Sequence, residues 1–86
     1  MVETTLTVKN QVGLHARPAS QITRLAKKCN STIIISKGDT EANARSMLHL
    51  LALEASCGDE VRVVVSGTDE EDVLATVCEI ISSEEE

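Results

Sequence analysis

The sequence has no phenylalanine, tryptophan or tyrosine and only one proline. Without aromatic rings it lacks the stacking platforms of single-stranded nucleic acid binders, and its net charge of −6 opposes contact with a phosphate backbone. It has no run of about 18 apolar residues that could span a membrane, and its first nine residues resemble neither a signal nor a transit peptide. We therefore expect a cytoplasmic protein that binds neither nucleic acid nor membrane, with an aliphatic core.

The three cysteines are also few, and their number is odd. Cys29, Cys57 and Cys78 fit no CxxC spacing, which argues against both a disulfide framework and a zinc knuckle. We expect reduced, mostly buried thiols, and we expect neither a metal nor another cofactor.

The charges are unevenly distributed over the 86 residues, which we interpret as a single domain spanning 1–86. Residues 1–43 carry six basic and three acidic side chains, whereas residues 44–86 carry two and eleven. This asymmetry suggests that an acidic partner approaches the first half of the chain.

Apolar and polar residues alternate from Val2 to Lys9, which predicts a half-buried strand. A helix is expected from about Ala16, with Pro18 in its first turn, where proline removes only an amide that has no acceptor. The β-branched run Thr32–Ile35 and the segment Thr40–Asn43 flank a Lys-Gly-Asp turn and predict a hairpin.

In the second half, Ser46 precedes a helix over Met47–Leu53 whose apolar residues are too many for one buried stripe, so part of this surface is expected to be exposed. A strand follows at Val61–Val65. Thr68 and Glu71 have the spacing of a capping box in front of another helix, and the acidic end 84–86 is expected to be solvated. The predicted order is β-α-β-β-α-β-α, an α+β fold.

The segment Gly13–Pro18 carries the strongest indication of chemistry. A glycine loop there delivers His15 to the start of a helix, where the amides of the first turn lack acceptors and can bind an anion. The positive helix end favours the neutral, nucleophilic imidazole, and the guanidinium of Arg17 could bind the oxygens of a phosphoryl group on the ring. A His-x-Arg sequence alone does not identify such a site. In an arbitrary protein, a loop histidine beside a solvated arginine would be the preferred interpretation.

Two motifs resolve this choice. Gly13-Leu14-His15-Ala16-Arg17-Pro18-Ala19 resembles, without a gap, the active-site motif of the HPr family, the histidine-containing phosphocarriers of the phosphoenolpyruvate-dependent phosphotransferase system. Asn43-Ala44-Arg45-Ser46 resembles the regulatory segment of the same family, with Arg45 in place of a usual lysine. The resemblance implies an open-faced β-sandwich, in which a four-stranded antiparallel sheet carries three helices on one face.

The resemblance also implies roles for individual residues. Enzyme I would transfer a phosphoryl group from phosphoenolpyruvate to Nδ1 of His15, Arg17 would steady its oxygens, and a IIA-type domain would accept it. The chain would be a monomeric covalent carrier and not an enzyme with its own turnover. Ser46 would be the target of an HPr kinase/phosphorylase in organisms that have one, besides being a favourable helix N-cap. The surface that binds these partners would comprise Met47, Leu48, Leu51, Arg24 and Lys27.

The chain departs from the common family pattern at His49, where glycine is frequent, and at Glu54, where small residues are frequent. We interpret His49 as a partly exposed helix residue, since no cysteine or carboxylate lies at ligand spacing. The segment Glu41-Ala42-Asn43 also resembles the nitrogen-related branch of the family. The alternative function is therefore a regulatory binding module that acts through Ser46 or through complex formation. A hydrolase is disfavoured, because no base, orienting group or oxyanion site accompanies His15.

Overall fold

The computed structural model describes residues 1–83 and has the predicted β-α-β-β-α-β-α order. The elements are β1 (Val2–Thr7), α1 (Ala16–Lys28), β2 (Ser31–Lys37), β3 (Thr40–Asn43), α2 (Met47–Ala52), β4 (Glu60–Gly67) and α3 (Glu70–Ser82). The acidic segment 84–86, expected to be solvated, lies outside the described residues. No helix within residues 1–83 combines the length and hydropathy that a membrane span needs.

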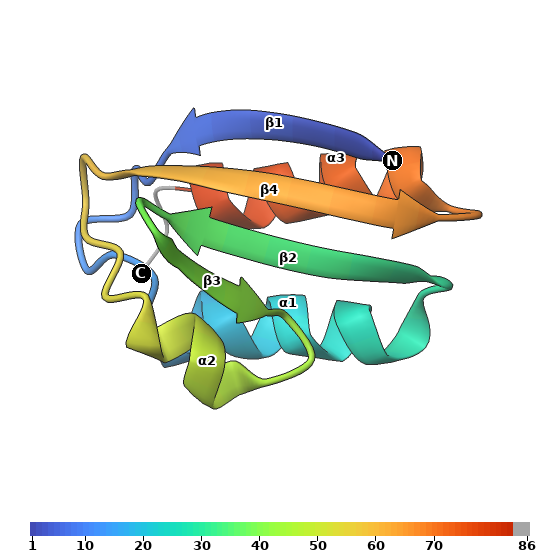
Figure 1. Cartoon of the computed structure of the whole chain (residues 1–86). Coiled ribbons are helices and arrows are strands. Elements are labelled where there is room, and N and C mark those ends of the chain that lie inside the picture. The colour runs from blue at the N-terminus through green and yellow to red at the C-terminus, as the bar shows by residue number, and fades with distance from the viewer. Residues whose placement is uncertain (84–86) are drawn as a thin grey trace.

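The four strands form one antiparallel sheet in the order β1-β4-β2-β3. The central strand β4 pairs Val65 with Val2 of β1 and with Ile33 of β2, and β2 and β3 form the expected hairpin. Helices α1 and α3 lie side by side across one face of the sheet, and α2 packs against α1 and β3 (Figure 1). This is the predicted open-faced sandwich.

The core lies between the sheet and the helices and is aliphatic throughout, as the composition requires. Alternate residues of β2 and β4 point into it, because successive side chains of a strand face opposite sides. They meet one side of each helix, and the side chains that are completely enclosed are Ile22, Ile33, Ile35, Leu50, Val61, Val63, Val65 and Val77. The opposite face of the sheet is more polar and carries the exposed ion pair between Arg62 and Glu3, 2.6 Å apart.

The predicted capping box of α3 is wrong. The N-cap is Asp69 instead of Thr68, and no side chain caps the helix. The Asp69 carboxylate accepts hydrogen bonds from the backbone N–H of Asn30, at 3.0 Å, and from the Ser31 hydroxyl. It therefore joins the start of α3 to the turn between α1 and β2, a long-range contact that takes the place of a local cap.

The prediction of mostly buried thiols is also wrong. Cys57 is exposed, and Cys29 and Cys78 are only partly buried, although all three are free cysteines. Cys29 is the C-cap of α1 and Cys57 lies in the turn before β4, so both belong to element ends, which are more open to solvent. Partial burial raises the pKa of the Cys78 thiol.

Candidate functional site

A tight loop formed by residues 10–14 leads into α1. Asn10 is 5% exposed, and its side-chain oxygen accepts the N–H of Val12 at 2.8 Å while its carbonyl accepts the N–H of Gly13 at 2.9 Å. The sequence predicts a loop here, but the role of Asn10 was not predicted. An asparagine three residues before a glycine could have indicated it, because asparagine readily forms such turns with its own backbone.

Gly13 is required at this position for two reasons. Its φ of +79° lies in the left-handed region, and a Cβ atom built on it would stand only 2.5 Å from the Ala55 carbonyl oxygen. The next residue, Leu14, donates its N–H to the same oxygen at 2.8 Å. The loop that precedes His15 is thus held directly against the segment between α2 and β4.

His15 is the N-cap of α1, as the sequence predicted from the glycine loop. The backbone N–H of Arg17 donates to Nδ1 of His15 over 3.5 Å, and the His15 carbonyl accepts the N–H of Ala19 at 3.1 Å. Nε2 is buried and has no hydrogen-bond partner among residues 1–83. Because Nδ1 accepts a hydrogen bond, the neutral ring carries its proton on Nε2 and keeps a lone pair on Nδ1.

The surroundings of Nδ1 suit an anion. The first turn of α1 contains no acidic residue and includes Arg17, so the positive helix end is not neutralised by its own side chains. Arg17 also lines a cavity of about 80 Å³ with Pro18 and Gln21, next to the end of α3. His15 itself is not among the residues that line this cavity. The amides of the first turn, together with Arg17, are the groups that could bind the oxygens of a group attached to Nδ1.

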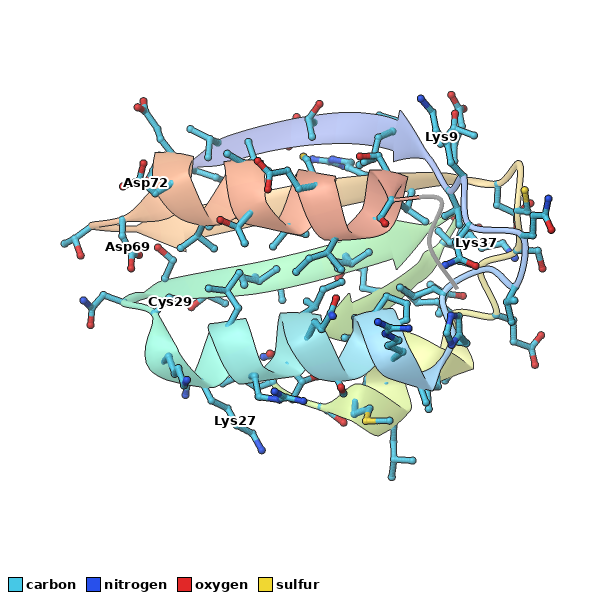
Figure 2. The ribbon with its side chains drawn as sticks, turned by 180° about the vertical axis from the view of Figure 1, so that it is seen from behind. Lys9, Lys27, Cys29, Lys37, Asp69 and Asp72 are labelled. Atoms are coloured by element: carbon cyan, nitrogen blue, oxygen red, sulfur yellow. The ribbon has the colours of Figure 1, made fainter. Side chains whose placement is uncertain are left out.

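The helix α2 has the partly exposed apolar surface that its sequence indicated. Leu50 and Leu53 are buried, Met47 and Leu51 are half-buried, and Leu48 is 78% exposed. Because α2 packs against α1, this surface lies on the same helical layer as the exposed Arg24 and Lys27. Lys27 projects away from the sheet near the far end of α1 (Figure 2).

Ser46 is the N-cap of α2, as expected, and its hydroxyl oxygen accepts the N–H of His49 at 3.3 Å. Its side chain is partly exposed. His49 is itself exposed on α2, and residues 1–83 contain no group of three or more His, Cys, Asp or Glu side chains that could hold a metal ion.

Comparisons with known proteins identify the family of the chain. Residues 2–83 match the family described as PTS HPr component phosphorylation site. The chain is 38% identical to phosphocarrier protein HPr of Treponema pallidum over 90% of this chain and 88% of that protein. It is 33% identical to phosphocarrier protein NPr of Shewanella violacea over 95% and 90%. It is 31% identical to HPr-like protein Crh of Bacillus subtilis over 98% and 99%.

The solved structures lead to the same result. HPr from Thermoanaerobacter tengcongensis superimposes with a TM-score of 0.87 at 36% identity, covering 94% of this chain and 91% of that chain. HPr from Bacillus anthracis gives 0.87 at 26% identity, covering 94% and 96%. Sequence match, fold and the N-capping histidine together establish that the chain belongs to the HPr family of phosphocarrier proteins.

Proposed function

We propose that this chain carries a phosphoryl group on Nδ1 of His15, accepting it from phosphoenolpyruvate through enzyme I and passing it to a IIA-type domain. The observation that carries the proposal is the position of His15 as the N-cap of α1, with Nδ1 directed at the N–H of Arg17. A phosphoryl group on that nitrogen would be within reach of helix amides and the Arg17 guanidinium.

The transfer itself needs little from this protein. The Nδ1 lone pair attacks the phosphorus held on enzyme I, the new N–P bond forms, and the donor atom of enzyme I keeps the electron pair of the bond that breaks. The Nε2 proton stays on the ring. Helix amides and Arg17 then offset the negative charge that arrives. Because the group must leave again in the next step, binding that is strong only in the resting phosphorylated state would slow the relay.

The docking surface would be the outer side of the helical layer, from His15 at the start of α1 to Lys27 near its end. Met47, Leu48 and Leu51 supply an apolar contact, and Arg24 and Lys27 supply positive charge toward an acidic partner. In this role the chain is a substrate and product of its partners and not an enzyme with independent turnover.

Ser46 supports a second function, regulation by phosphorylation. Its partly exposed hydroxyl stands at the start of α2, next to the apolar contact surface. A phosphate there would add about −1.5 to −2 charges and would weaken docking to an acidic partner. If the chain acts mainly as a regulatory module, an HPr kinase with ATP should phosphorylate the wild type but not Ser46→Ala.

A further experiment assigns the chain to the sugar branch or to the nitrogen branch of the phosphotransferase system, since its relatives include HPr, NPr and Crh proteins. Incubation with enzyme I of the sugar branch and of the nitrogen branch, in parallel, distinguishes them by rate. We propose that the carrier acts as a monomer. Similar solved structures described as dimers include HPr of Thermoanaerobacter tengcongensis and Crh of Bacillus subtilis, so the mass in solution must be measured alongside.

The decisive experiment measures intact-protein mass after incubation with magnesium, phosphoenolpyruvate and enzyme I of the same organism. The wild type should gain one phosphoryl group that is lost in acid and stable in alkali, whereas His15→Ala should gain none. His49→Ala is the matched control and should behave as the wild type. Phosphorylation of His15→Ala would refute the assignment of the site.

A further inference from the structure

Lys37, the last residue of β2, makes two contacts with the segment between α2 and β4. Its amine donates to the backbone carbonyl oxygen of Glu54 at 2.9 Å and lies 3.1 Å from the Asp59 carboxylate. The same carboxylate oxygen of Asp59 accepts the N–H of Ser56 at 2.8 Å. One ammonium group therefore links both ends of the loop 54–59.

This loop needs such support because its backbone is strained at Glu54. The φ of Glu54 is +52°, and among residues 1–83 it is the one position other than glycine with a positive φ. A side chain in the left-handed region is disfavoured, because its Cβ atom comes too close to the following carbonyl oxygen. The loop has no helix or strand of its own. Val8 holds its second half through backbone hydrogen bonds with Gly58 and Asp59, at 2.8 and 2.9 Å, and Lys37 adds the side-chain contact to the strained first half.

A short series of hydrogen bonds connects the same loop to His15. The carbonyl oxygen of Ala55, one residue after Glu54, accepts the N–H of Leu14 at 2.8 Å, and the N–H of His15 donates to the Gly13 carbonyl at 3.0 Å. Gly13 is packed so closely against Ala55 that a Cβ atom would not fit. Lys37 lies among the loops at the end of the molecule where α1 begins, whereas Asp69 and Asp72 lie at the opposite end (Figure 2).

From these contacts we infer that Lys37 is a positioning residue for phosphoryl transfer: through Glu54 and Ala55 it fixes the backbone that presents His15. This inference rests on the proposed carrier function. It assigns the role to a side chain that lies outside the two family motifs and touches neither His15 nor the incoming group.

We expect loss of the Lys37 contacts to lower the rate of phosphoryl transfer and to change the free energy of unfolding little. An ion pair between two side chains that are each about a third exposed, here 35% and 36%, contributes little to the free energy of unfolding. Its effect on geometry can be larger, because a displacement of about 1 Å at a reacting group can cost up to about 100-fold in rate. Loss of the Lys37 contacts should displace His15 by less than about 1 Å, so the effect on the rate should be smaller than this limit.

Lys37→Met is the informative variant, since it keeps the length of the aliphatic chain and removes both contacts. In phosphoryl transfer from phosphorylated enzyme I we expect kcat to fall about threefold to tenfold, with KM changed less than twofold. The amide hydrogen of Leu14 should exchange faster by a similar factor, because its acceptor is no longer held. Asp59→Asn, which leaves the contact with Glu54 in place, should have a smaller effect on both.

Arg62→Met is the matched control, because it removes another exposed ion pair, on the polar face of the sheet. It should leave kcat, KM and the exchange of Leu14 unchanged. An unchanged kcat in Lys37→Met would overturn the inference. So would a raised KM with normal Leu14 exchange, which would make Lys37 a docking residue.

The two proposals fail in different ways. If the wild type takes up no phosphoryl group from an active enzyme I, the proposed function fails, and a role for Lys37 in transfer fails with it. The Leu14 exchange rate still decides whether Lys37 holds the loop. If the wild type is phosphorylated and Lys37→Met is phosphorylated at the same rate, only the inference about Lys37 fails.

Discussion

At His15 one lone pair has two uses. The Nδ1 atom that would attack phosphorus also accepts the N–H of Arg17, but over 3.5 Å, which is long for a hydrogen bond and therefore weak. Giving it up costs little, and a phosphoryl oxygen on Nδ1 would offer the same amide a charged acceptor in its place. A phosphoryl group on Nδ1 would therefore need no large rearrangement of the resting site.

Gly13 should be the most sensitive residue of the loop. Gly13→Ala places a Cβ atom 2.5 Å from the Ala55 carbonyl in a backbone with φ of +79°, so we expect a loss of about 2 kcal/mol or more in the free energy of unfolding. Gly38→Ala is the control: its φ is +59°, but nothing lies within 4 Å, so it should cost only about 1 kcal/mol. Urea denaturation measures both, and equal losses would contradict the packing argument.

The backbone strain at Glu54 can also be tested by substitution. Glu54→Gly relieves the left-handed strain of about 1 to 2 kcal/mol and loses about 0.5 to 1 kcal/mol through the greater freedom of unfolded glycine. We therefore expect the free energy of unfolding to rise by about 0.5 kcal/mol. Glu54→Ala removes the same carboxylate but keeps the Cβ atom, and it should bring no gain. A stabilisation of similar size in both variants would place the effect in the side chain.

Among the elements, α2 depends most on its cap, because a helix of six residues makes few internal hydrogen bonds. Ser46→Ala removes the acceptor of the His49 N–H and should lower the free energy of unfolding by about 0.5 to 1 kcal/mol. Thr76→Ala removes a hydroxyl that bonds a carbonyl within α3, and it should change stability by less than about 0.5 kcal/mol. Thermal denaturation of both variants checks this, and an equal effect would argue against capping by Ser46.

The start of α3 should give stability a pH dependence. Hydrogen bonds from Asn30 and Ser31 hold the pKa of Asp69 below its ordinary value of 3.8. A lowered pKa in the folded state means that this contribution is present above about pH 4 and is lost as the pH falls through the native pKa. The difference in the free energy of unfolding between the wild type and Asp69→Asn should therefore become smaller from pH 5 to pH 2. Asp72→Asn controls for the loss of one charge from the same helical end, and a gap that stays constant would refute the linkage.

For the molecule as a whole, the sequence predicted what depends on local patterns. Alternation in residues 2–9 and 61–65 predicted the strands β1 and β4, although not their places in the sheet, and the glycine loop before Ala16 predicted His15 at the helix start. The apolar excess of α2 predicted that part of its surface is exposed, and in the structure Leu48 is exposed. Periodicity and capping act within a few residues, so they can be read directly from the chain.

What the sequence could not predict depends on contacts between distant residues. Asp69 accepts a hydrogen bond from Asn30, 39 positions earlier. The capping box that the local sequence Thr68–Glu71 predicts does not form. Lys37 reaches Glu54, 17 positions later, and Ala55 supports the loop before His15. Burial of the Nε2 atom of His15 likewise depends on packing that no single motif contains.

The central claim is that phosphorus becomes bonded to Nδ1 of His15, and nitrogen NMR of the phosphorylated chain tests it most directly. With ¹⁵N-labelled histidine the protein shows only two imidazoles, His15 and His49, so the unmodified ring is an internal reference. We predict that, after incubation with enzyme I and phosphoenolpyruvate, the Nδ1 resonance of His15 shifts and couples to phosphorus while both His49 nitrogens stay unchanged. Coupling at Nε2 of His15, or at either nitrogen of His49, would contradict the account.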